Sequence, residues 1–298
     1  MVDMEPNTTT TTPTAPRRLP NRALVVGGTG KTGRRVVERL VALGVDTRSV
    51  SRSTAPRFDW ADPTTWPAAL DDVDAAYLTY YPDVAFPGAA EAIAALGVAA
   101  VERGVRRIVL LSGRGEPEAK VSEDALLAAV PGATILRSSW FMQDFSEHFL
   151  YEPVLDGVIA LPAGDVTEPF IDVEDIADVA VAALTTDGHE GVVYELTGPR
   201  LLSFADAAAE LSEAIGRPIR YLPVTEAEYA AAAIQAGVPV EEAEPLATLF
   251  GVVLDGRNAH LDDGVERALG RPARDFADYL SRTVPTGVWS IADEQAAG

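Results

Sequence analysis

The sequence contains no cysteine, which excludes disulfide bonds, thiol nucleophiles and cysteine-ligated metals. Histidine is scarce as well. His148, His189 and His260 lie far apart and form neither an HxH nor an HExxH pattern, so we expect no metal site. The only lysines are Lys31 and Lys120. Arginine therefore carries almost all of the positive charge.

Long apolar runs are also missing. No run approaches the roughly 18 residues of a membrane span, so we expect no membrane-spanning segment. Residues 1–20 are rich in Thr and Pro and lack the apolar stretch of a secretory signal, which predicts a disordered tail and a cytoplasmic protein. The net charge of −21 disfavours nucleic acid and anionic lipid as partners, although most of this charge can serve solubility alone. An anionic ligand then needs a local positive site on the protein. The sequence does not indicate the oligomeric state.

Apolar segments alternate with amphipathic ones from residue 23 onward, which indicates an α/β fold with a parallel, doubly wound sheet of the Rossmann type. The expected strands are residues 23–26, 47–50, 73–79, 107–112, 134–137 and 192–196. The expected helices are residues 33–43, 88–103, 121–130, 171–184 and 203–215. We expect a nucleotide-binding domain over residues 21–198 and a small, mostly helical substrate lobe over 199–285. Residues 286–298 then form a C-terminal tail.

A glycine-rich loop joins the first strand to the first helix. Residues 27–33 read GGTGKTG, with Gly27, Gly30 and Gly33 spaced GxxGxxG. Bare backbone amides and the helix N-terminus suit a diphosphate, and Gly33 lets the helix pack close to the strand. The loop therefore predicts a dinucleotide site that also includes Thr29, Lys31 and Thr32. A tight turn without a ligand is the alternative. A Walker loop fails on spacing, because its first glycine falls on a valine, Val25.

The end of the second strand indicates which dinucleotide binds. NAD-binding units place an acidic residue there to bind the ribose 2′-hydroxyl. This strand instead ends in Ser51 and Arg52, whose hydroxyl and guanidinium suit a 2′-phosphate, whereas Asp46 lies at the opposite end. The sequence therefore predicts NADP(H) as the cofactor, the alternative being that Arg52 is a plain surface charge.

The Tyr-x-x-x-Lys dyad of short-chain dehydrogenases is absent. Glu116 stands four residues before Lys120, and Gly27 stands four residues before Lys31. By position, the two slots of the dyad fall near Ala119 and Glu123. Reduction then requires another proton donor or a water. The alternative is an acceptor such as an iminium carbon, whose reduction is complete after hydride addition without a proton.

Polar residues near the expected cofactor mouth are candidates for catalysis: Ser112, Glu123, Lys120 and Tyr80. Each of these residues also has a purely structural interpretation, as a helix cap, an exposed charge or a loop residue. Trp140, Phe141, Met142 and Phe145 could form an apolar substrate wall or simply pack in the core.

The chain resembles the NmrA-like, atypical short-chain dehydrogenase group over residues 22–283. The resemblance is carried by LVVGGTGKTGRRVVERL, SVSRS, FDWADPTTW, GVRRIVLLSGRG, TILRSSWFMQDF and EPFIDVEDIADVA. Within that group it is most similar to the ergot-alkaloid iminium reductase branch, which includes agroclavine dehydrogenases.

The resemblance implies a preference for NADP, with Asp59 and Trp60 near the adenine and Thr79, Tyr80 and Tyr81 along the cofactor. The chain departs from the group where Ser138 follows Arg137 in place of proline, and where Glu123 stands in place of His or Lys. Some members bind NADP without known turnover and act as redox-sensing regulators.

Three functions follow as hypotheses. The first is an NADPH-dependent reductase of a small apolar quinone, ketone or iminium compound, in secondary metabolism. The second is a non-catalytic NADP(H) sensor that binds a partner protein. The third is a redox-neutral cyclase or epimerase of a biosynthetic pathway.

Overall fold

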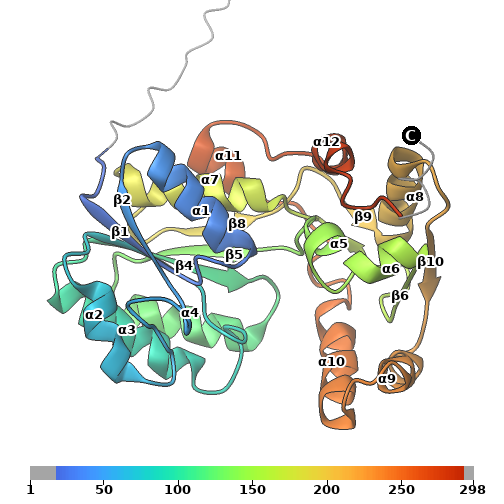
Figure 1. The fold of residues 1–298 in the computed structure, drawn as a ribbon, viewed down its shortest axis with the longest axis horizontal. Coiled ribbons are helices and arrows are strands. Elements are labelled where there is room, and N and C mark those ends of the chain that lie inside the picture. The colour runs from blue at the N-terminus through green and yellow to red at the C-terminus, as the bar shows by residue number, and fades with distance from the viewer. Residues whose placement is uncertain (1–17, 292–298) are drawn as a thin grey trace, which may run out of the picture.

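A six-stranded parallel sheet forms the centre of the computed structural model, which describes residues 18–291 apart from the side chains of residues 242 and 245 (Figure 1). Its order is β2-β1-β3-β4-β5-β8. The strands are β1 (Arg22–Val26), β2 (Asp46–Val50), β3 (Ala75–Leu78), β4 (Arg107–Gly113), β5 (Thr134–Ser138) and β8 (Val193–Leu196). These are the six strands expected from the sequence, with shifts of one or two residues at their ends.

Helices cover both faces of the sheet, which confirms the doubly wound architecture. One face carries α2 (Trp66–Leu70), α3 (Ala89–Glu102) and α4 (Pro117–Ala129). The other carries α1 (Lys31–Ala42), α7 (Val173–Thr185) and α11 (Gly264–Leu269) (Figure 1). The apolar side chains of β1, β3, β4 and β5 alternate between these two layers, so the central strands are buried on both sides.

The strand order places a topological switch point between β1 and β3. The chain leaves β1 for β2 on one side and later returns to β3 on the other. Open α/β sheets bind ligands outside the carboxyl ends of their strands at such a point. The glycine loop follows β1 and Thr79 follows β3, so the switch point lies at the predicted site.

A second lobe with its own core packs beside the sheet. Its helices are α5 (Asp144–Glu147), α6 (Tyr151–Asp156), α8 (Phe204–Ile215), α9 (Glu226–Gln235), α10 (Val240–Val253) and α12 (Phe276–Thr283). Two short pairs of strands complete it: β6 (Val158–Leu161) with β10 (Arg220–Pro223), and β7 (Thr167–Glu168) with β9 (Leu202–Ser203).

The expected domain boundary between residues 198 and 199 is wrong. Residues 142–170 belong to the core of the second lobe, together with side chains from residues 202–289. In contrast, α11 lies in the expected substrate lobe but packs on the sheet domain. The lobe is therefore assembled from two separate parts of the chain.

The expected tails need a correction at each end. Trp289 is buried in the lobe core and donates a hydrogen bond from Nε1 to the carbonyl of Phe145 at 2.9 Å, so the C-terminal segment is packed at least to this residue. At the other end, the Arg18 amide donates to the Thr185 carbonyl. Residues 1–17 and 292–298, where the remaining tail expectations fall, lie outside the described residues. None of the helices within residues 18–291 has the length and apolar character needed to cross a bilayer.

Candidate functional site

The glycine loop is folded so tightly that two of its positions exclude any side chain. Gly27 has a φ of +73°, and a Cβ there would lie 2.2 Å from Thr79 Oγ1. A Cβ on Gly33 would lie 2.2 Å from the Gly27 carbonyl oxygen. Glycine at 27 and 33 therefore lets the loop pack against both β3 and the first turn of α1.

The N-terminus of α1 is open toward the ligand side. Its N-cap is Gly30, which supplies no side-chain cap, and a Cβ on Gly30 would meet only the Gly27 carbonyl, at 3.3 Å. The first amides of a helix have no partner within the helix, so they and the positive end of the helix dipole suit an anion. Thr29 is exposed beside these amides and Thr32 is buried beneath them. The residues present thus fit a dinucleotide diphosphate.

Arg52 provides an uncommitted cation just past the end of β2. Its guanidinium lies over the Tyr81 ring, 4.6 Å from the ring centre, and it forms no ion pair with any residue in the range 18–291. Ser51 and Ser53 lie beside it and share a hydroxyl hydrogen bond of 3.1 Å. Asp46, at the far end of β2, is paired with Arg22 at 2.6 Å. This edge of the sheet can accept a 2′-phosphate.

Aromatic side chains line the next strand ends. Trp60 donates from Nε1 to the Thr79 carbonyl at 3.0 Å, and its ring lies 4.9 Å from that of Tyr80. The carboxylate of Asp59 pairs with Arg57 at 2.6 Å. These contacts hold Trp60 and Tyr80 at the carboxyl edge, where a bound nucleotide would pass.

A cavity of about 590 Å³ extends from this edge to the second lobe. Lys31, Thr79 and Tyr80 line its sheet side, and aromatic side chains line its lobe side. The aromatic wall consists of Trp140, Phe141, Phe149 and Phe250. Both the volume and the apolar wall are typical of a small-molecule site.

Only two of the four residues predicted for the apolar wall reach the cavity. Trp140 and Phe141 line the cavity. Met142 and Phe145 are wrong as wall residues, because they are 1% and 0% exposed within the lobe core. The chain turns into α5 here, and the ring of Phe145 packs against that of Phe170 instead.

Ser112 and Glu123 are held in a buried network. Ser112 lines the cavity, but its hydroxyl donates to Glu123 Oε1 at 2.6 Å. Glu123 is 1% exposed and forms an ion pair with Arg137, which also pairs with Glu195. Glu123 does not line the cavity, so its predicted role as a proton shuttle is replaced by a structural one.

Both lysines have carboxylate partners. Lys120 is exposed, pairs with Asp124 at 2.7 Å on the solvent face of α4 and does not line the cavity, so it is wrong as a catalytic candidate. Lys31 does line the cavity, where its Nζ lies 2.5 Å from Asp144 Oδ1. Burial raises the pKa of Asp144, and the cation of Lys31 opposes that shift.

Two carboxyl groups in the cavity were not predicted from the sequence. Asp83 and Glu116 both line it. Burial raises the pKa of Glu116 to about 7, helped by the charges of Asp83 and Glu118. Burial also raises the pKa of Asp83, against the effect of a hydrogen bond from the Ala85 amide. The signal that could have found them is position, since each follows a strand of the sheet.

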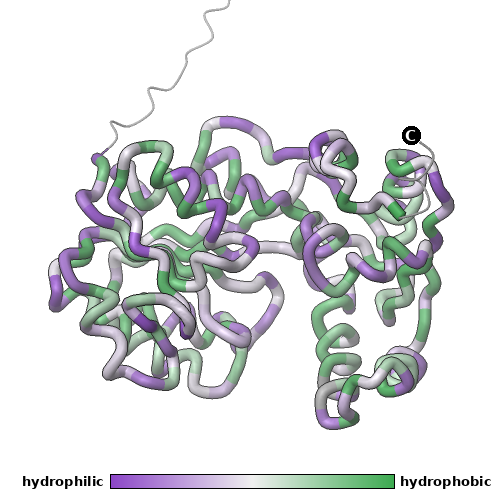
Figure 2. Tube along the Cα trace, in the orientation of Figure 1, coloured by the Kyte–Doolittle hydropathy of each residue, from purple (hydrophilic) through white to green (hydrophobic). Residues whose placement is uncertain are grey.

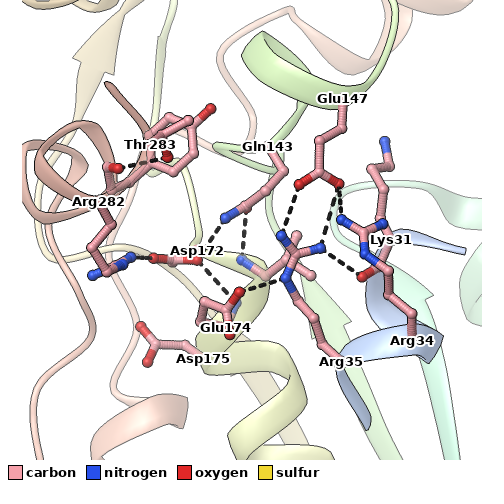
Figure 3. Close-up of polar contacts among 12 residues, drawn as sticks. Lys31, Arg34, Arg35, Gln143, Glu147, Asp172, Glu174, Asp175, Arg282 and Thr283 are labelled. Atoms are coloured by element: carbon pink, nitrogen blue, oxygen red, sulfur yellow. Dashed lines mark hydrogen bonds and ion pairs between the residues drawn. The ribbon is translucent and has the colours of Figure 1, made fainter. Parts of the chain in front are cut away.

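Charged contacts join α1 to the second lobe beside the cavity (Figure 3). Arg34 and Arg35 both pair with Glu147 of α5, at 2.5 and 2.7 Å. Arg35 also pairs with Glu174 of α7 at 2.5 Å. The helix that carries the glycine loop is thereby tied to the lobe that carries the aromatic wall.

Two curated proteins resemble the chain over almost its whole length. The NAD(P)H azoreductase of Xenophilus azovorans is 32% identical over 279 residues, which cover 86% of this chain and 96% of that protein. The agroclavine dehydrogenase of Claviceps fusiformis is 33% identical over 303 residues, covering 91% and 99%.

Solved structures share the fold. An NADPH-dependent quinone oxidoreductase of Escherichia coli, in complex with NADPH, superposes with a TM-score of 0.71 and 23% identity over 87% of this chain and 99% of that one. No family model matches the chain. The identity and coverage of the curated relatives, together with the doubly wound sheet and its glycine loop, show that the chain belongs to the NmrA-like, atypical short-chain dehydrogenase/reductase family.

Proposed function

We propose that the protein is an NADPH-dependent reductase of a small, largely apolar quinone, ketone or iminium compound in secondary metabolism. The observation that carries the proposal is the continuity of one cavity. It begins at Lys31, Thr79 and Tyr80 beside the glycine loop and ends at the aromatic wall of the lobe. A cofactor on the loop and a substrate against that wall would share this one cavity.

The chain's own residues divide the work of binding. The amides of residues 27–33 hold the diphosphate, while Arg52 and Ser51 hold the 2′-phosphate. Asp59, Trp60, Thr79 and Tyr81 position the rest of the nucleotide. When bound, NADPH supplies the hydride. Trp140 and Phe141 orient the acceptor and exclude water from it.

Relatives that reduce related acceptors support this class of substrate. The names of the curated relatives describe an azoreductase and an agroclavine dehydrogenase, and the structural relative is a quinone oxidoreductase. We extend to this chain the oxidoreductase activity that these names share, and the nicotinamide cofactor that two of them state. The apolar wall of the cavity supports a small, largely apolar acceptor.

The proposal is tested by binding and turnover together. Calorimetry is expected to show that NADPH binds, and the absorbance of reduced nicotinamide is expected to fall with at least one quinone, ketone or cyclic iminium compound. Trp140→Ala is expected to raise KM for that acceptor and to leave the Kd of NADPH unchanged. Bound NADPH without oxidation across the whole panel contradicts the proposal. Product of unchanged oxidation level, with no cofactor consumed, would indicate a cyclase or epimerase instead.

A second candidate is an NADP(H) sensor. One observation favours it: Ser112 and Glu123, two of the sequence-derived catalytic candidates, are committed to a network with Arg137. A sensor is expected to bind its partner protein with different affinities in the presence of NADP⁺ and NADPH. Equal affinities under both conditions exclude it.

A further inference from the structure

The carboxyl group of Glu116 lies over the end of β4. Glu116 is the N-cap of α4 and follows β4 by a short turn. A Cβ on Gly113, the last residue of β4, would lie 2.5 Å from Glu116 Oε1. The absence of a side chain at Gly113 therefore gives the carboxyl group its place at the strand end, where it faces the cavity.

The groups around Glu116 do not neutralise it. Asp83 approaches from the loop after β3, and Glu118 lies in the first turn of α4. The nearby cations are committed elsewhere. Arg114 pairs with Asp262 at 2.7 Å and Glu195 at 3.2 Å.

Arg257, the other cation nearby, pairs with Asp255 at 2.7 Å and donates to the Gly115 carbonyl at 3.0 Å. Glu116 has no ion pair with any residue in the described part of the chain. Like charges in a partly desolvated site favour the protonated form of one partner. A pKa of about 7 leaves a large fraction of Glu116 as the neutral acid at neutral pH.

Two other polar groups of the cavity are poorer proton donors. The Ser112 hydroxyl directs its proton to Glu123, and the Lys31 ammonium is paired with Asp144. Unlike these two groups, Glu116 has a carboxyl group that faces the cavity, forms no ion pair within residues 18–291 and is partly protonated near neutral pH. A general acid is most effective when its pKa lies near the working pH.

We propose that Glu116 is the proton donor of the reduction and that Asp83 is the positioning residue that keeps it in its acid form. The proposal rests on the proposed reductase function. Hydride adds to the electrophilic carbon, and the π electrons move to the oxygen or nitrogen. That atom takes the carboxyl proton of Glu116, which becomes a carboxylate and regains a proton from water. An iminium cation is complete after hydride addition and takes no proton.

The experiment compares two acceptors in the same protein: a ketone or quinone, and a preformed N,N-dialkyl iminium cation. Glu116→Gln is expected to lower kcat for the ketone or quinone by about 100-fold or more, the usual scale of general acid catalysis. Turnover of the iminium cation and the Kd of NADPH are expected to stay unchanged. Glu91→Gln, which changes the same charge on exposed α3, is the matched control and is expected to alter neither.

Two further variants test the charge and the position of the Glu116 carboxyl group. In the wild type, kcat for the ketone or quinone is expected to fall as pH rises through about 7, because the acid form of Glu116 is lost. Asp83→Asn removes the like charge and is expected to move this fall to lower pH. Gly113→Ala displaces the Glu116 carboxyl and is expected to reduce ketone turnover without changing NADPH binding or the melting temperature.

A measurement without substrate separates the two proposals. The infrared difference spectrum between wild type and Glu116→Gln is expected to show a protonated carboxyl band that titrates near pH 7. If the wild type turns over neither acceptor, the reductase function fails, and the infrared band still reports on the acid. If the wild type reduces the ketone and Glu116→Gln does so equally well, or loses both acceptors equally, the proton-donor role is overturned.

Discussion

At the scale of single residues, Arg52 distinguishes the two nicotinamide cofactors. Its guanidinium is exposed, stacked on Tyr81 and free of ion pairs within residues 18–291. A charge-assisted contact to a phosphate contributes about 1.5–3 kcal/mol, so Arg52→Ala is expected to raise the Kd of NADPH by about 10- to 100-fold. NADH lacks the 2′-phosphate, and its Kd is expected to change little. Calorimetry with both cofactors measures the difference.

The control for this prediction is Arg106→Ala. Arg106 is also exposed but lies at the amino-terminal edge of β4, away from the proposed site. The Arg106→Ala substitution removes the same charge and is expected to leave the Kd of NADPH and that of NADH unchanged. An equal loss of affinity for NADPH and NADH in Arg52→Ala would remove the assignment of Arg52 to the 2′-phosphate.

A second residue-scale prediction concerns the pH dependence of stability. Glu168 of β7 is 0% exposed, and neither carboxyl oxygen has a hydrogen-bond partner in the described part of the protein. Burial raises the pKa of Glu168 from 4.5 to about 7, although the charge of Arg114 opposes the shift. The folded state therefore binds the carboxyl proton of Glu168 more tightly than the unfolded state does. The contribution of this group to the free energy of unfolding is complete below pH 4.5 and is lost as pH rises through about 7.

Glu168→Gln cannot titrate at this position. It is expected to make the free energy of unfolding less dependent on pH between about 5 and 8, by on the order of 3 kcal/mol. Urea denaturation at several pH values measures the slope. Glu213→Gln, an exposed change on α8, is the control and is expected to keep the wild-type slope. An unchanged slope in Glu168→Gln would show that its carboxyl group is not protonated in the folded state.

Residues whose position depends on local sequence could be predicted. The glycine loop and Arg52 follow directly from strand ends, and the structure places them at the switch point. Met142 and Lys120 were assigned to the wrong surroundings, because the direction of a side chain depends on how its element packs. Asp83 and Glu116 were missed because only the folded sheet brings the loops after β3 and β4 together.

At the scale of elements, the central strands and most helices could be read from the sequence, because each buries a regular apolar pattern. Several helices also carry local start signals, such as the capping box of Ser203 and Asp206 at α8. The strands β6, β7, β9 and β10 were not expected. They span two to four residues and pair with partners distant in the chain, so no short-range pattern marks them.

The role of α10 also depends on packing. Figure 2 shows a hydrophobic colour along most of this helix. Phe250 anchors it against Trp140 and Phe149, with ring centres 5.8 and 5.4 Å apart, while Leu249 beside it lines the cavity and is 45% exposed. This helix thus closes the cavity opposite the sheet. The sequence predicted a helical segment here but gave no sign of what it would face.

Phe250→Ala is expected to loosen α10 from the lobe. Loss of a buried phenylalanine costs about 3–5 kcal/mol, and here that cost falls on one helix hairpin. Hydrogen exchange is expected to quicken in α9 and α10 and to stay unchanged in α3. KM for the apolar acceptor rises, whereas NADPH affinity does not. Val252→Ala, on the exposed face of α10, is the control. Uniformly faster exchange in every element would contradict a local role.

At the scale of the whole molecule, two cores meet through a polar interface. Asp172, the N-cap of α7, is 0% exposed and accepts hydrogen bonds from Gln143 at 2.7 Å and from the Glu174 amide at 2.9 Å. It also pairs with Arg282 of α12 (Figure 3). Gln143 in turn accepts from the Val173 amide at 2.9 Å. One carboxylate thereby links the sheet domain to two separate parts of the lobe.

Asp172→Ala is expected to uncouple the two cores. Removing one partner of a buried ion pair costs about 3–5 kcal/mol, and the partial exposure of Arg282 brings the expected loss to about 2–4 kcal/mol. The tryptophans report on each core separately. Trp60 and Trp66 lie in the sheet domain, and Trp140 and Trp289 lie in the lobe. A Trp60→Phe, Trp66→Phe background therefore isolates the lobe signal.

In that background, with Asp172 unchanged, the tryptophan fluorescence is expected to change at the same temperature as the circular dichroism of the whole protein. In Asp172→Ala the lobe fluorescence is expected to change at a lower temperature than the remaining helical signal. Asp178→Ala is the matched control, because it breaks ion pairs of α7 with Arg39, Arg271 and Arg274, none of which belongs to the lobe core. It should lower the melting temperature while keeping the two signals coincident. Since the proposed cavity lies between the two cores, coincident signals in Asp172→Ala would mean that other contacts, such as Arg35 with Glu147, hold the substrate wall in place over the cofactor.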